Sequence, residues 1–535
     1  MVREQRGSQH PGIHLSPVTF LYNVGMNIRL PIATILLLCL VACSVNPVTG
    51  DRQLILVSGE QELAMGAQNY VPMQQSQGGP YDVDPALTEY VRSVGNRLAA
   101  VSDARLPYEF TVLNNSVPNA WALPGGKIAI NRGLLVELKS EAELAAVLGH
   151  EIVHAAARHT AQQMSKGMLL QGLVIGTSIA TSDSDYGNMA VGGASIAAQL
   201  LSTRYGRSAE LESDKYGMRY MAKAGYDPQG AVALQETFLR LSEGRNQDWL
   251  SGLFASHPPS AERVTANKKT AGKLGVGSEL GIESFNAVIK KTLAAKPAYD
   301  AYDEGRKALA DKRADEALVL ANKALDLFPK EAHFHALRGD VRLVNKQYSM
   351  AVTNFNRAIS RRGDFFYYHL QRGITKNELG QIDGAIIDLE HSVTLLPTAP
   401  AHFTLGKIKQ DRGAVADAIE HYKVVAKSGG SYGEAAKTEL AKLELPTNPS
   451  AYISSACGDD GSGQLGVSVR NDTPMSVTGV EVLFRYIDAA GIERQQSRNV
   501  GGQIAAGKVA TVRTGLALSA GTSCAAKVVA AEIAP

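Results

Sequence analysis

The stretch His150-Glu151-Ile152-Val153-His154 carries residue types and a spacing that suit a metal-dependent hydrolase. In a helix, residues four apart lie on one face, so both imidazoles can bind one zinc ion at the usual distance of about 2.0–2.1 Å. Glu151 stands one step round from His150 and can take a proton from water at an open coordination position. We interpret the stretch as a metal site. The alternative is a helix that merely places two histidines near its core.

A catalytic zinc site needs a third protein ligand and keeps one position for water. Downstream, residues 207–214 offer three acidic side chains on another expected helix. Glu210 and Asp214 are one turn apart and share a face, whereas Glu212 points nearly opposite. Alone, such a charge run would be a solvent-exposed face. The histidine pair upstream makes it a candidate source of the third ligand.

The elements that must position these residues follow from hydrophobic periodicity. Ser140 followed by Glu143 is a capping-box pattern, which predicts a helix that continues to about Met164. Further segments precede it: helices at 60–68 and 85–100, strands at 110–113 and 127–130, and a turn between these strands at 124–126. The mixture predicts an α+β domain over residues 44–290.

Two series of small residues recur every 33 or 34 positions between residues 295 and 445. They are Gly305, Gly339, Gly373 and Gly406, and Ala317, Ala351, Ala385 and Ala418. Small residues let paired helices approach closely, and stacked units bury the surface that one unit cannot bury alone. The period resembles the tetratricopeptide repeat, so we expect an all-α solenoid at 295–445.

The character changes again in residues 450–535. Strand-like segments at 465–470, 477–486 and 509–516 are separated by turn residues, which predicts a small all-β sandwich. Cys457 and Cys524 lie at its two ends and could pair in an oxidising compartment. Two unpaired buried thiols are the alternative.

The N-terminus has the features of a targeting signal. From Met26, an apolar run through Leu40 has the length of a signal-peptide core. The tetrapeptide Leu40-Val41-Ala42-Cys43 resembles a bacterial lipobox, in which Cys43 would receive acyl chains; an ordinary cleaved signal is the alternative. We expect residues 1–43 to be a leader and lipoprotein signal peptide. Met26 is the expected true start, and Ser44 favours the outer membrane by the same resemblance.

Length and composition limit the remaining possibilities. At 535 residues the chain is too long for one core, and 45% hydrophobic with 20% charged residues is ordinary for folded protein. A formal net charge of +2, without basic runs interleaved with aromatic residues, gives no reason to expect a nucleic-acid partner. No other segment approaches the roughly 18 uninterrupted apolar residues of a membrane span, so no transmembrane helix is expected.

Together these motifs resemble the zinc peptidases related to the CAAX prenyl endopeptidase and the HtpX-type heat-shock peptidases, in particular their periplasmic branch with tetratricopeptide tails. The resemblance covers about residues 44–270. It includes Asn46-Pro47-Val48-Thr49-Gly50, residues 119–126, and His257-Pro258 with Arg263. Trp121 and Ser213 stand where Phe and Ala are frequent in the family, and both changes leave the ligand set intact.

The resemblance implies a zincin-type fold with one Zn²⁺ per chain. It makes His150, His154 and Glu210 the ligands and Glu151 the general base. Asp214 would hydrogen-bond a ligand histidine and fix its tautomer.

Two further residues are candidates for a group that gates the site or stabilises the oxyanion, namely His257 and Arg207. His159 is expected to be a packing or surface group. The strand at 127–130 would align substrate by β-addition.

The resemblance also implies an envelope quality-control endopeptidase, an outer-membrane lipoprotein that faces the periplasm and cleaves misfolded or stalled envelope proteins. The repeats would bind protein substrates or an envelope assembly machinery. The alternative is a chaperone-like adaptor or scaffold with a latent zinc site.

Overall fold

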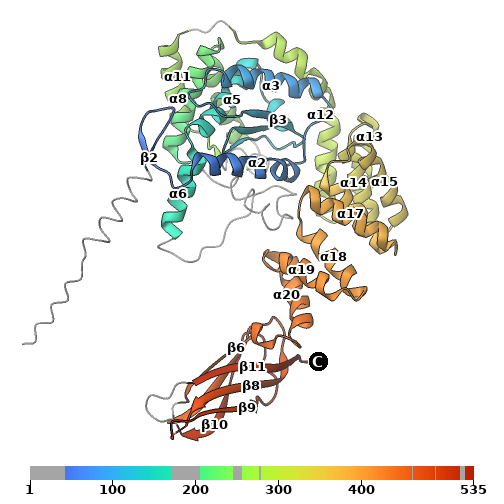
Figure 1. Cartoon of the computed structure of the whole chain (residues 1–535). Helices are drawn as coiled ribbons and strands as arrows, with labels where there is room; N and C mark the ends of the chain where they lie inside the picture. Colours follow the sequence, from blue (N-terminus) through green and yellow to red (C-terminus); the bar gives the residue numbers. More distant parts are fainter. Residues whose placement is uncertain are drawn as a thin grey trace, which may run out of the picture.

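The structure is a computed structural model that describes residues 43–171, 205–244, 256–275, 279–460, 462–488, 490–517 and 524–535. Three regions follow one another along the chain: an α+β region, a helical solenoid and a β region (Figure 1). The expected leader lies outside the described residues up to position 42. None of the described helices combines the length and the hydropathy that a membrane span requires.

The α+β region contains a three-stranded sheet with the order β3-β5-β4. β3 (Glu109–Leu113) runs parallel and β4 (Ala120–Leu123) antiparallel to the central β5 (Lys127–Asn131). The predicted strands β3 and β5 are confirmed, but the turn at 124–126 joins β4 to β5. β4 is not predicted from periodicity because all four of its residues are buried, which removes the alternation.

Because β5 is the central strand, both of its edges are paired within the sheet. The expectation that the strand at 127–130 aligns a substrate by β-addition is therefore wrong. β4 is an edge strand, and among the described residues its named partner is β5 alone.

Helices surround this sheet, with the long buried α5 packed against β4, α3, α8 and α9 (Figure 1). The helices are α2 (Gly59–Ser76), α3 (Pro85–Ala99), α4 (Arg132–Leu135), α5 (Glu141–Ala156), α6 (His159–Gln171), α8 (Arg207–Lys223), α9 (Gln229–Gly244) and α11 (Ala261–Leu274). A two-stranded ribbon of β1 (Cys43–Val45) and β2 (Arg52–Leu54) precedes them.

The helix predicted to run from Ser140 to about Met164 is two helices. Arg158 adopts a left-handed conformation with φ 61°, which ends α5 and starts α6 in a new direction. The Arg158 guanidinium holds this break in place by donating to Glu62, Ser44 and the Val57 carbonyl. Long-range contacts therefore determine the break, which no local glycine or proline signals.

The solenoid consists of antiparallel helix pairs, as predicted. They are α12 (Ile282–Ala310), α13 (Ala314–Leu327), α14 (Ala332–Val344), α15 (Tyr348–Arg361), α16 (Phe366–Glu378), α17 (Ile382–Leu395), α18 (Ala399–Asp411), α19 (Val415–Ala426) and α20 (Gly430–Glu444). The periodic alanines are fully buried, and a Cβ at Gly339 would lie 2.6 Å from the Phe355 ring. Close helix contact thus accounts for the repeat. α12 is continuous across 290–295, so one helix spans the boundary between the two predicted regions.

Buried polar contacts join the solenoid to the α+β region. The Asn114 amide donates to Glu331 at 3.1 Å, and the Arg362 guanidinium donates to the Gly78 carbonyl at 3.2 Å. His333 Nε2 lies 3.1 Å from the same carbonyl, and Nδ1 lies 2.7 Å from the Tyr368 hydroxyl. Since these groups are fixed from both sides, the α+β region and the solenoid pack against each other, with α12 and α14 beside the α+β region in Figure 1.

The β region packs two three-stranded antiparallel sheets face to face around one apolar core. After a short helix, η2 (Pro449–Ala451), the strands are β6 (Ile453–Asp459), β7 (Gln464–Asn471), β8 (Val477–Ile487), β9 (Glu493–Asn499), β10 (Val509–Ala517) and β11 (Cys524–Ile533). Cys457 and Cys524 form a disulfide between β6 and β11, one strand of each sheet. The exposed β9 lacks the apolar alternation that would have predicted it.

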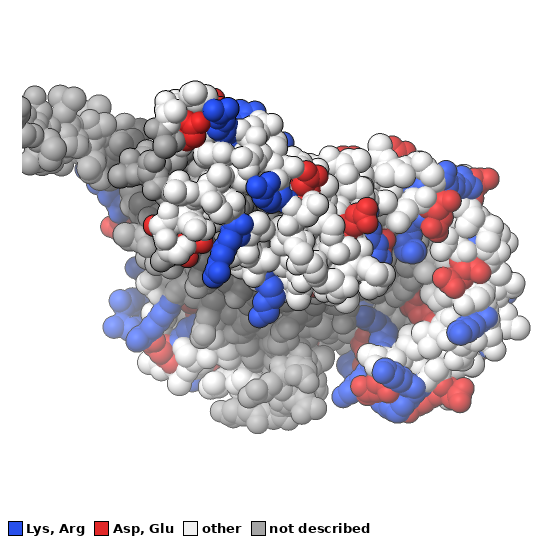
Figure 2. All heavy atoms as spheres, turned by 90° about the horizontal axis from the view of Figure 1, so that it is seen from below, with Lys and Arg blue, Asp and Glu red and all other residues white. Residues whose placement is uncertain are grey.

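Acidic and basic side chains are interspersed on the face shown in Figure 2, in keeping with the net charge of +2. Charge on this face therefore gives no argument for a particular partner.

His333 lies buried at the contact between the α+β region and the solenoid, where the neutral imidazole is favoured. Burial lowers the pKa of His333 from 6.5 to about 4, against the opposing effect of Glu331. A depressed folded-state pKa means that the unfolded chain binds the proton better, so the contribution to stability is complete above pH 6.5 and is lost as the pH falls toward 4. The full effect is up to about 3 kcal/mol.

We predict that His333→Gln flattens the loss of unfolding free energy between pH 6.5 and about 4 relative to the parent chain. Urea unfolding followed by circular dichroism across this range provides the measurement. Parallel pH profiles for the two chains would contradict the prediction.

Candidate metal centre

Helix α5 is capped and then buried along its whole length. The Ser140 hydroxyl accepts the Glu143 N–H at 3.1 Å, while the Glu143 carboxylate accepts the Lys139 N–H at 2.8 Å. Its backbone lies against that of α8, since a Cβ at Gly217 would come within 3.0 Å of Gly149 and His150 backbone atoms. This close approach brings the histidines of α5 within reach of the acids of α8.

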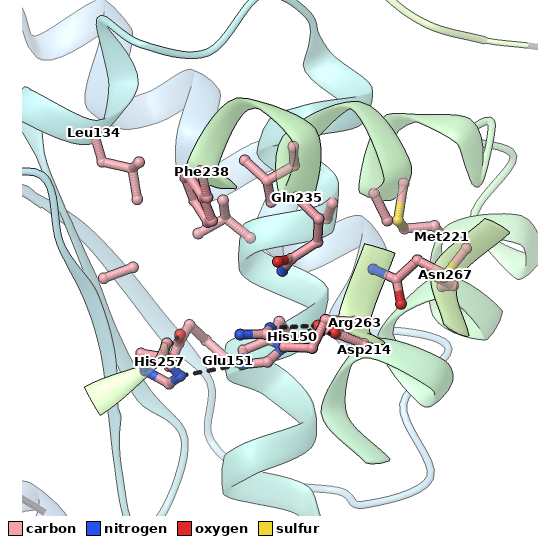
Figure 3. A pocket seen from close by; sticks show the side chains of 16 residues that line it. Leu134, His150, Glu151, Asp214, Met221, Gln235, Phe238, His257, Arg263 and Asn267 are labelled. Atoms are coloured by element: carbon pink, nitrogen blue, oxygen red, sulfur yellow. Dashed lines mark hydrogen bonds and ion pairs between the residues drawn. The ribbon is translucent and has the colours of Figure 1, made fainter. Parts of the chain in front are cut away.

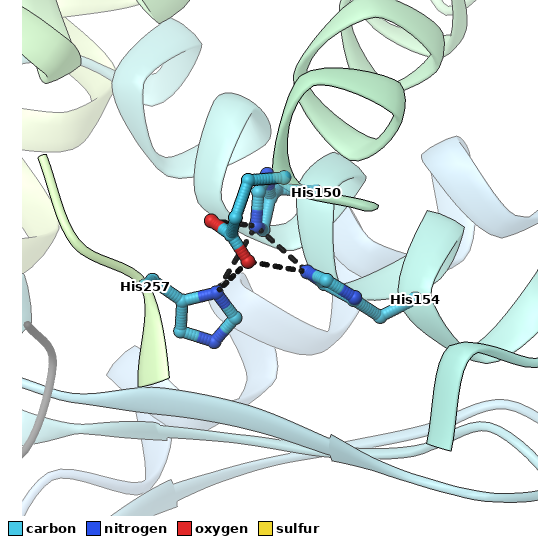
Figure 4. A group of neighbouring side chains, drawn as sticks. His150, His154 and His257 are labelled. Carbon is cyan, nitrogen blue, oxygen red and sulfur yellow. Dashed lines mark hydrogen bonds and ion pairs between the residues drawn. The ribbon is translucent and has the colours of Figure 1, made fainter. Parts of the chain in front are cut away.

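Four side chains from three segments converge on one point, as Figure 4 shows. His150, His154, Glu210 and His257 each offer one ligand atom, and these atoms lie within 4.8 Å of one another. The two ligand nitrogens of α5, both Nε2, are 2.9 Å apart. Glu210 lies 3.4 Å from His154 and 3.5 Å from His150, while His257 Nδ1 lies 3.0 Å from Glu210 and 3.2 Å from His150.

The donor set fits a bound metal ion. Three imidazoles and one carboxylate are the ligands that zinc and related divalent ions bind, and all four groups are buried. Two ring nitrogens that face each other at hydrogen-bond distance need a proton or a metal cation between their lone pairs. The structure thus brings together the three ligands expected from the sequence, and His257 joins them.

Asp214 and Arg263 hold the ligands in orientation. The Asp214 Oδ1 atom lies 2.9 Å from His150 Nδ1, which is the contact expected for Asp214. Arg263 donates to Asp214 at 2.6 and 2.7 Å and lies 2.8 Å from the Glu210 carboxylate. Burial opposes ionisation of Asp214, but Arg263 and His150 outweigh it and hold the Asp214 pKa below its usual value. Because ionised Asp214 can only accept, His150 donates its Nδ1–H to it and turns Nε2 toward the cluster, where the neutral imidazole would offer a lone pair to a metal ion.

Glu151 has the environment of a general base. Its Oε2 atom is buried without a hydrogen-bond partner among the described residues, and Oε1 lies 3.6 Å from His257. Burial raises the Glu151 pKa against the opposing effects of His257 and His150, which makes the carboxylate a better proton acceptor.

A pocket adjoins Glu151 and His150, between α5, α8, α9 and α11 (Figure 3). Its walls are largely apolar and include Leu134, Met221 and Phe238. The space is small, so its walls mainly place an apolar surface beside His150 and Glu151.

The structure does not bring Arg207 to the cluster. This residue lies in the first turn of α8 with its side chain 78% exposed, and it pairs with Glu262. Because the side chain points into solvent, the hypothesis that Arg207 gates the site or stabilises the oxyanion is wrong for this conformation. Arg263, which the sequence marked only as part of a family motif, supplies the buried guanidinium instead.

Two other neighbours of His154 were not identified from the sequence. The Tyr205 ring stacks on His154 with centroids 3.9 Å apart. His159 is buried, in keeping with the expectation of a packing group, and its Nδ1 lies 2.9 Å from Nδ1 of His154, a contact that was not expected. The five-residue spacing hid this contact, because the helix break at Arg158 turns His159 back toward the cluster.

Comparison with known proteins agrees with this geometry. Residues 85–271 match peptidase family M48. The Beta-barrel assembly-enhancing protease of Yersinia pestis is 28% identical over 352 residues, covering 59% of this chain and 70% of that protein. Its namesake from Escherichia coli (strain K12) is 27% identical over 262 residues, covering 48% of this chain and 52% of that protein. The match to the second relative thus spans about half of its length.

Among solved structures, MamA aligns with 26% of this chain and 84% of its own, at 19% identity and a TM-score of 0.23. That score is too low to add to the helix pairing already described. The family match and the buried cluster together make residues 85–271 a metallopeptidase domain.

Removal of the buried guanidinium gives a test of the cluster electrostatics. Arg263→Gln leaves Glu210 and Asp214 buried without their cationic partner, which is expected to cost about 3–5 kcal/mol in the metal-free chain. A bound divalent ion restores positive charge, so the loss should shrink in the presence of zinc. Urea unfolding with chelator and with zinc measures both values.

Arg207→Gln on the exposed face is the matched control and should leave stability unchanged in both conditions. An equal loss for Arg263→Gln with and without zinc would show that the ion does not bind beside Glu210.

Proposed function

We propose that this chain, whose residues 85–271 form a peptidase family M48 domain, is a zinc-dependent endopeptidase of the bacterial cell envelope. The observation that supports this most directly is the convergence of His150, His154 and Glu210 on one point, with Glu151 beside them. A structural zinc site would need four protein ligands and no adjacent base. The unpartnered Glu151 oxygen therefore favours hydrolysis.

The chain's own groups divide the chemistry between them. Zinc in this cluster would lower the pKa of a water molecule and polarise a peptide carbonyl. Glu151 Oε2 accepts the proton of the attacking water and then delivers it to the nitrogen of the leaving amine. Asp214 keeps His150 in the binding tautomer. Arg263 holds the pKa of Asp214 below its usual value, and His257 and His150 hold the pKa of Glu210 below its own, so both acids stay ionised in the buried site.

The substrate backbone would lie along the free edge of β4. Ala120 of this strand lines the pocket beside His150 and Glu151, so a segment paired with β4 would pass the reacting groups. Pairing by main-chain hydrogen bonds tolerates many sequences, which suits an enzyme for unfolded protein segments.

His257 occupies the open side of the metal-binding cluster in this conformation. Its Nδ1 atom lies within 3.2 Å of both Glu210 and His150, where a fourth ligand would stand. Its other ring nitrogen faces Glu151 at 3.6 Å. In the proposed enzyme His257 would have to move before water and substrate enter. The same contact favours the second candidate function, a chaperone-like adaptor with a latent zinc site, because four protein ligands leave no open position.

The cellular setting is proposed from the relatives and the N-terminus. The relatives are named for enhancing beta-barrel assembly, and by extension this chain would cleave misfolded or stalled envelope proteins. The solenoid would bind protein substrates or the assembly machinery. Cys43 would carry the lipid anchor to the outer membrane, facing the periplasm. Because Cys43 already pairs with Leu54 in the β1–β2 ribbon, the anchor would hold the peptidase domain directly at the membrane surface.

Replacement of the base separates the enzyme from the adaptor. Glu151→Gln is expected to retain one zinc per chain but to lose casein cleavage by at least about 100-fold, because general-base catalysis is removed. Zinc content by mass spectrometry and casein digestion measure the two properties in chains that start after Cys43. Casein cleavage that survives Glu151→Gln would contradict the proposed mechanism.

Replacement of the fourth donor tests whether the site is gated. His257→Ala is expected to keep the zinc and to cleave casein faster than the parent chain, because the closed position becomes free for water. If the parent and His257→Ala both bind zinc but cleave no unfolded substrate, the adaptor function is favoured.

A further inference from the structure

The motif Asn46-Pro47-Val48-Thr49-Gly50 takes no part in the metal chemistry, yet its asparagine is buried. Asn46 Oδ1 accepts the backbone N–H groups of Val48 at 2.9 Å and Thr49 at 3.3 Å, so the motif is a turn closed on its own side chain. The amide nitrogen remains to donate, and it donates to Glu212 Oε1 at 2.8 Å. The turn is thereby tied to helix α8.

Glu212 continues this connection to the metal centre through His159. Its Oε1 atom lies 3.4 Å from His159 Nε2, and Nδ1 of the same ring lies 2.9 Å from His154 Nδ1. His159 is 3% exposed and His154 is 1% exposed. A line of side-chain contacts thus runs from the N-terminal turn to one of the metal ligands.

The chemistry of Glu212 fixes the direction of each proton along this line. An ionised carboxylate only accepts, so neutral His159 must carry its proton on Nε2 and accept at Nδ1. His154 must then donate its Nδ1–H to His159. This arrangement leaves the Nε2 lone pair of His154 directed at the cluster, in the form that a metal ion requires.

A second acid of α8 does the same for the other histidine of α5. Asp214 acts directly, since it lies 2.9 Å from His150 Nδ1. Glu212 acts indirectly. Its side chain leaves α8 on another side and is linked to His154 through His159. One helix therefore sets the tautomers of both histidines.

We propose that Asn46, Glu212 and His159 form a positioning chain that holds His154 in its metal-binding tautomer. Through this positioning chain, metal affinity depends on the contact between the N-terminal turn at Asn46 and helix α8. The turn directly follows the expected lipidation site. This inference rests on the proposed function, because it takes His154 as a ligand through Nε2. None of the three residues is among the four donors of the metal cluster.

Zinc affinity of the full chain, measured by competition with a chromophoric chelator, tests the proposal without reference to activity. Glu212→Gln and His159→Phe are expected to weaken zinc binding by about 10–100-fold, the usual effect of losing a group that orients a ligand. Asn46→Ala should weaken it in the same direction by a smaller factor, since Glu212 keeps its contact with His159.

Glu331→Gln is the matched control. Glu331 is 2% exposed and accepts from Asn114 at the contact between the α+β region and the solenoid, outside the positioning chain. Its replacement should lower the melting temperature of the metal-free chain and leave zinc affinity unchanged. An equal loss of zinc affinity in Glu331→Gln would overturn the proposal, because the effect would then reflect general damage.

Unchanged zinc affinity in folded Glu212→Gln would also overturn the proposal, whatever the result for His159→Phe. Circular dichroism of the metal-free variants establishes that they are folded. If the unaltered chain binds no zinc, the proposed function itself fails, and this result is distinct from normal binding that the variants leave unchanged.

Discussion

The buried pair of carboxylates on α8 is the constraint on which the rest of the structure depends. Glu210 and Asp214 stand among imidazoles in the interior, where unpaired negative charge would be prohibitively costly. Arg263 supplies one compensating charge, and the ligand cluster has the geometry to bind another. The close contact of α5 with α8 at Gly149 and Gly217 keeps these groups in register. In the proposed chemistry Glu151 stays available as the base, because its Oε2 atom has no hydrogen-bond partner among the described residues.

Around this centre, the elements restrict what can reach it. The outer edge of β4 pairs with no other strand in the part of the chain that the structure describes, the pocket beside Glu151 is apolar, and His257 stands at the position of a fourth ligand. The solenoid is fixed to the same α+β region through contacts such as that of Glu331 with Asn114. A partner bound to the helical repeats would therefore sit at a defined position relative to the peptidase domain. In the proposed function, this geometry would present unfolded envelope proteins to a site that is closed at rest.

Sequence patterns predicted those features of the structure that depend on the spacing of residues along a helix. The i, i+4 spacing of the two histidines and of Glu210 with Asp214 indicated their faces, and the recurring glycines indicated close helix pairs. What could not be predicted depends on tertiary contacts. The left-handed Arg158 is held by partners distant in sequence, and the helix break there brings His159 to His154. Arg263 reaches its two acids only through the packing of α11 on α8, and the uniformly buried β4 has no alternation to detect.

Zinc K-edge X-ray absorption of the chain as purified tests the central claim most directly. The account predicts one ion per chain with only nitrogen and oxygen ligands, including three imidazoles in the resting protein. It also predicts that His257→Ala loses one imidazole but keeps the ion. A sulfur ligand, or an ion whose spectrum does not change when His150 is replaced, would place the metal elsewhere and contradict the account.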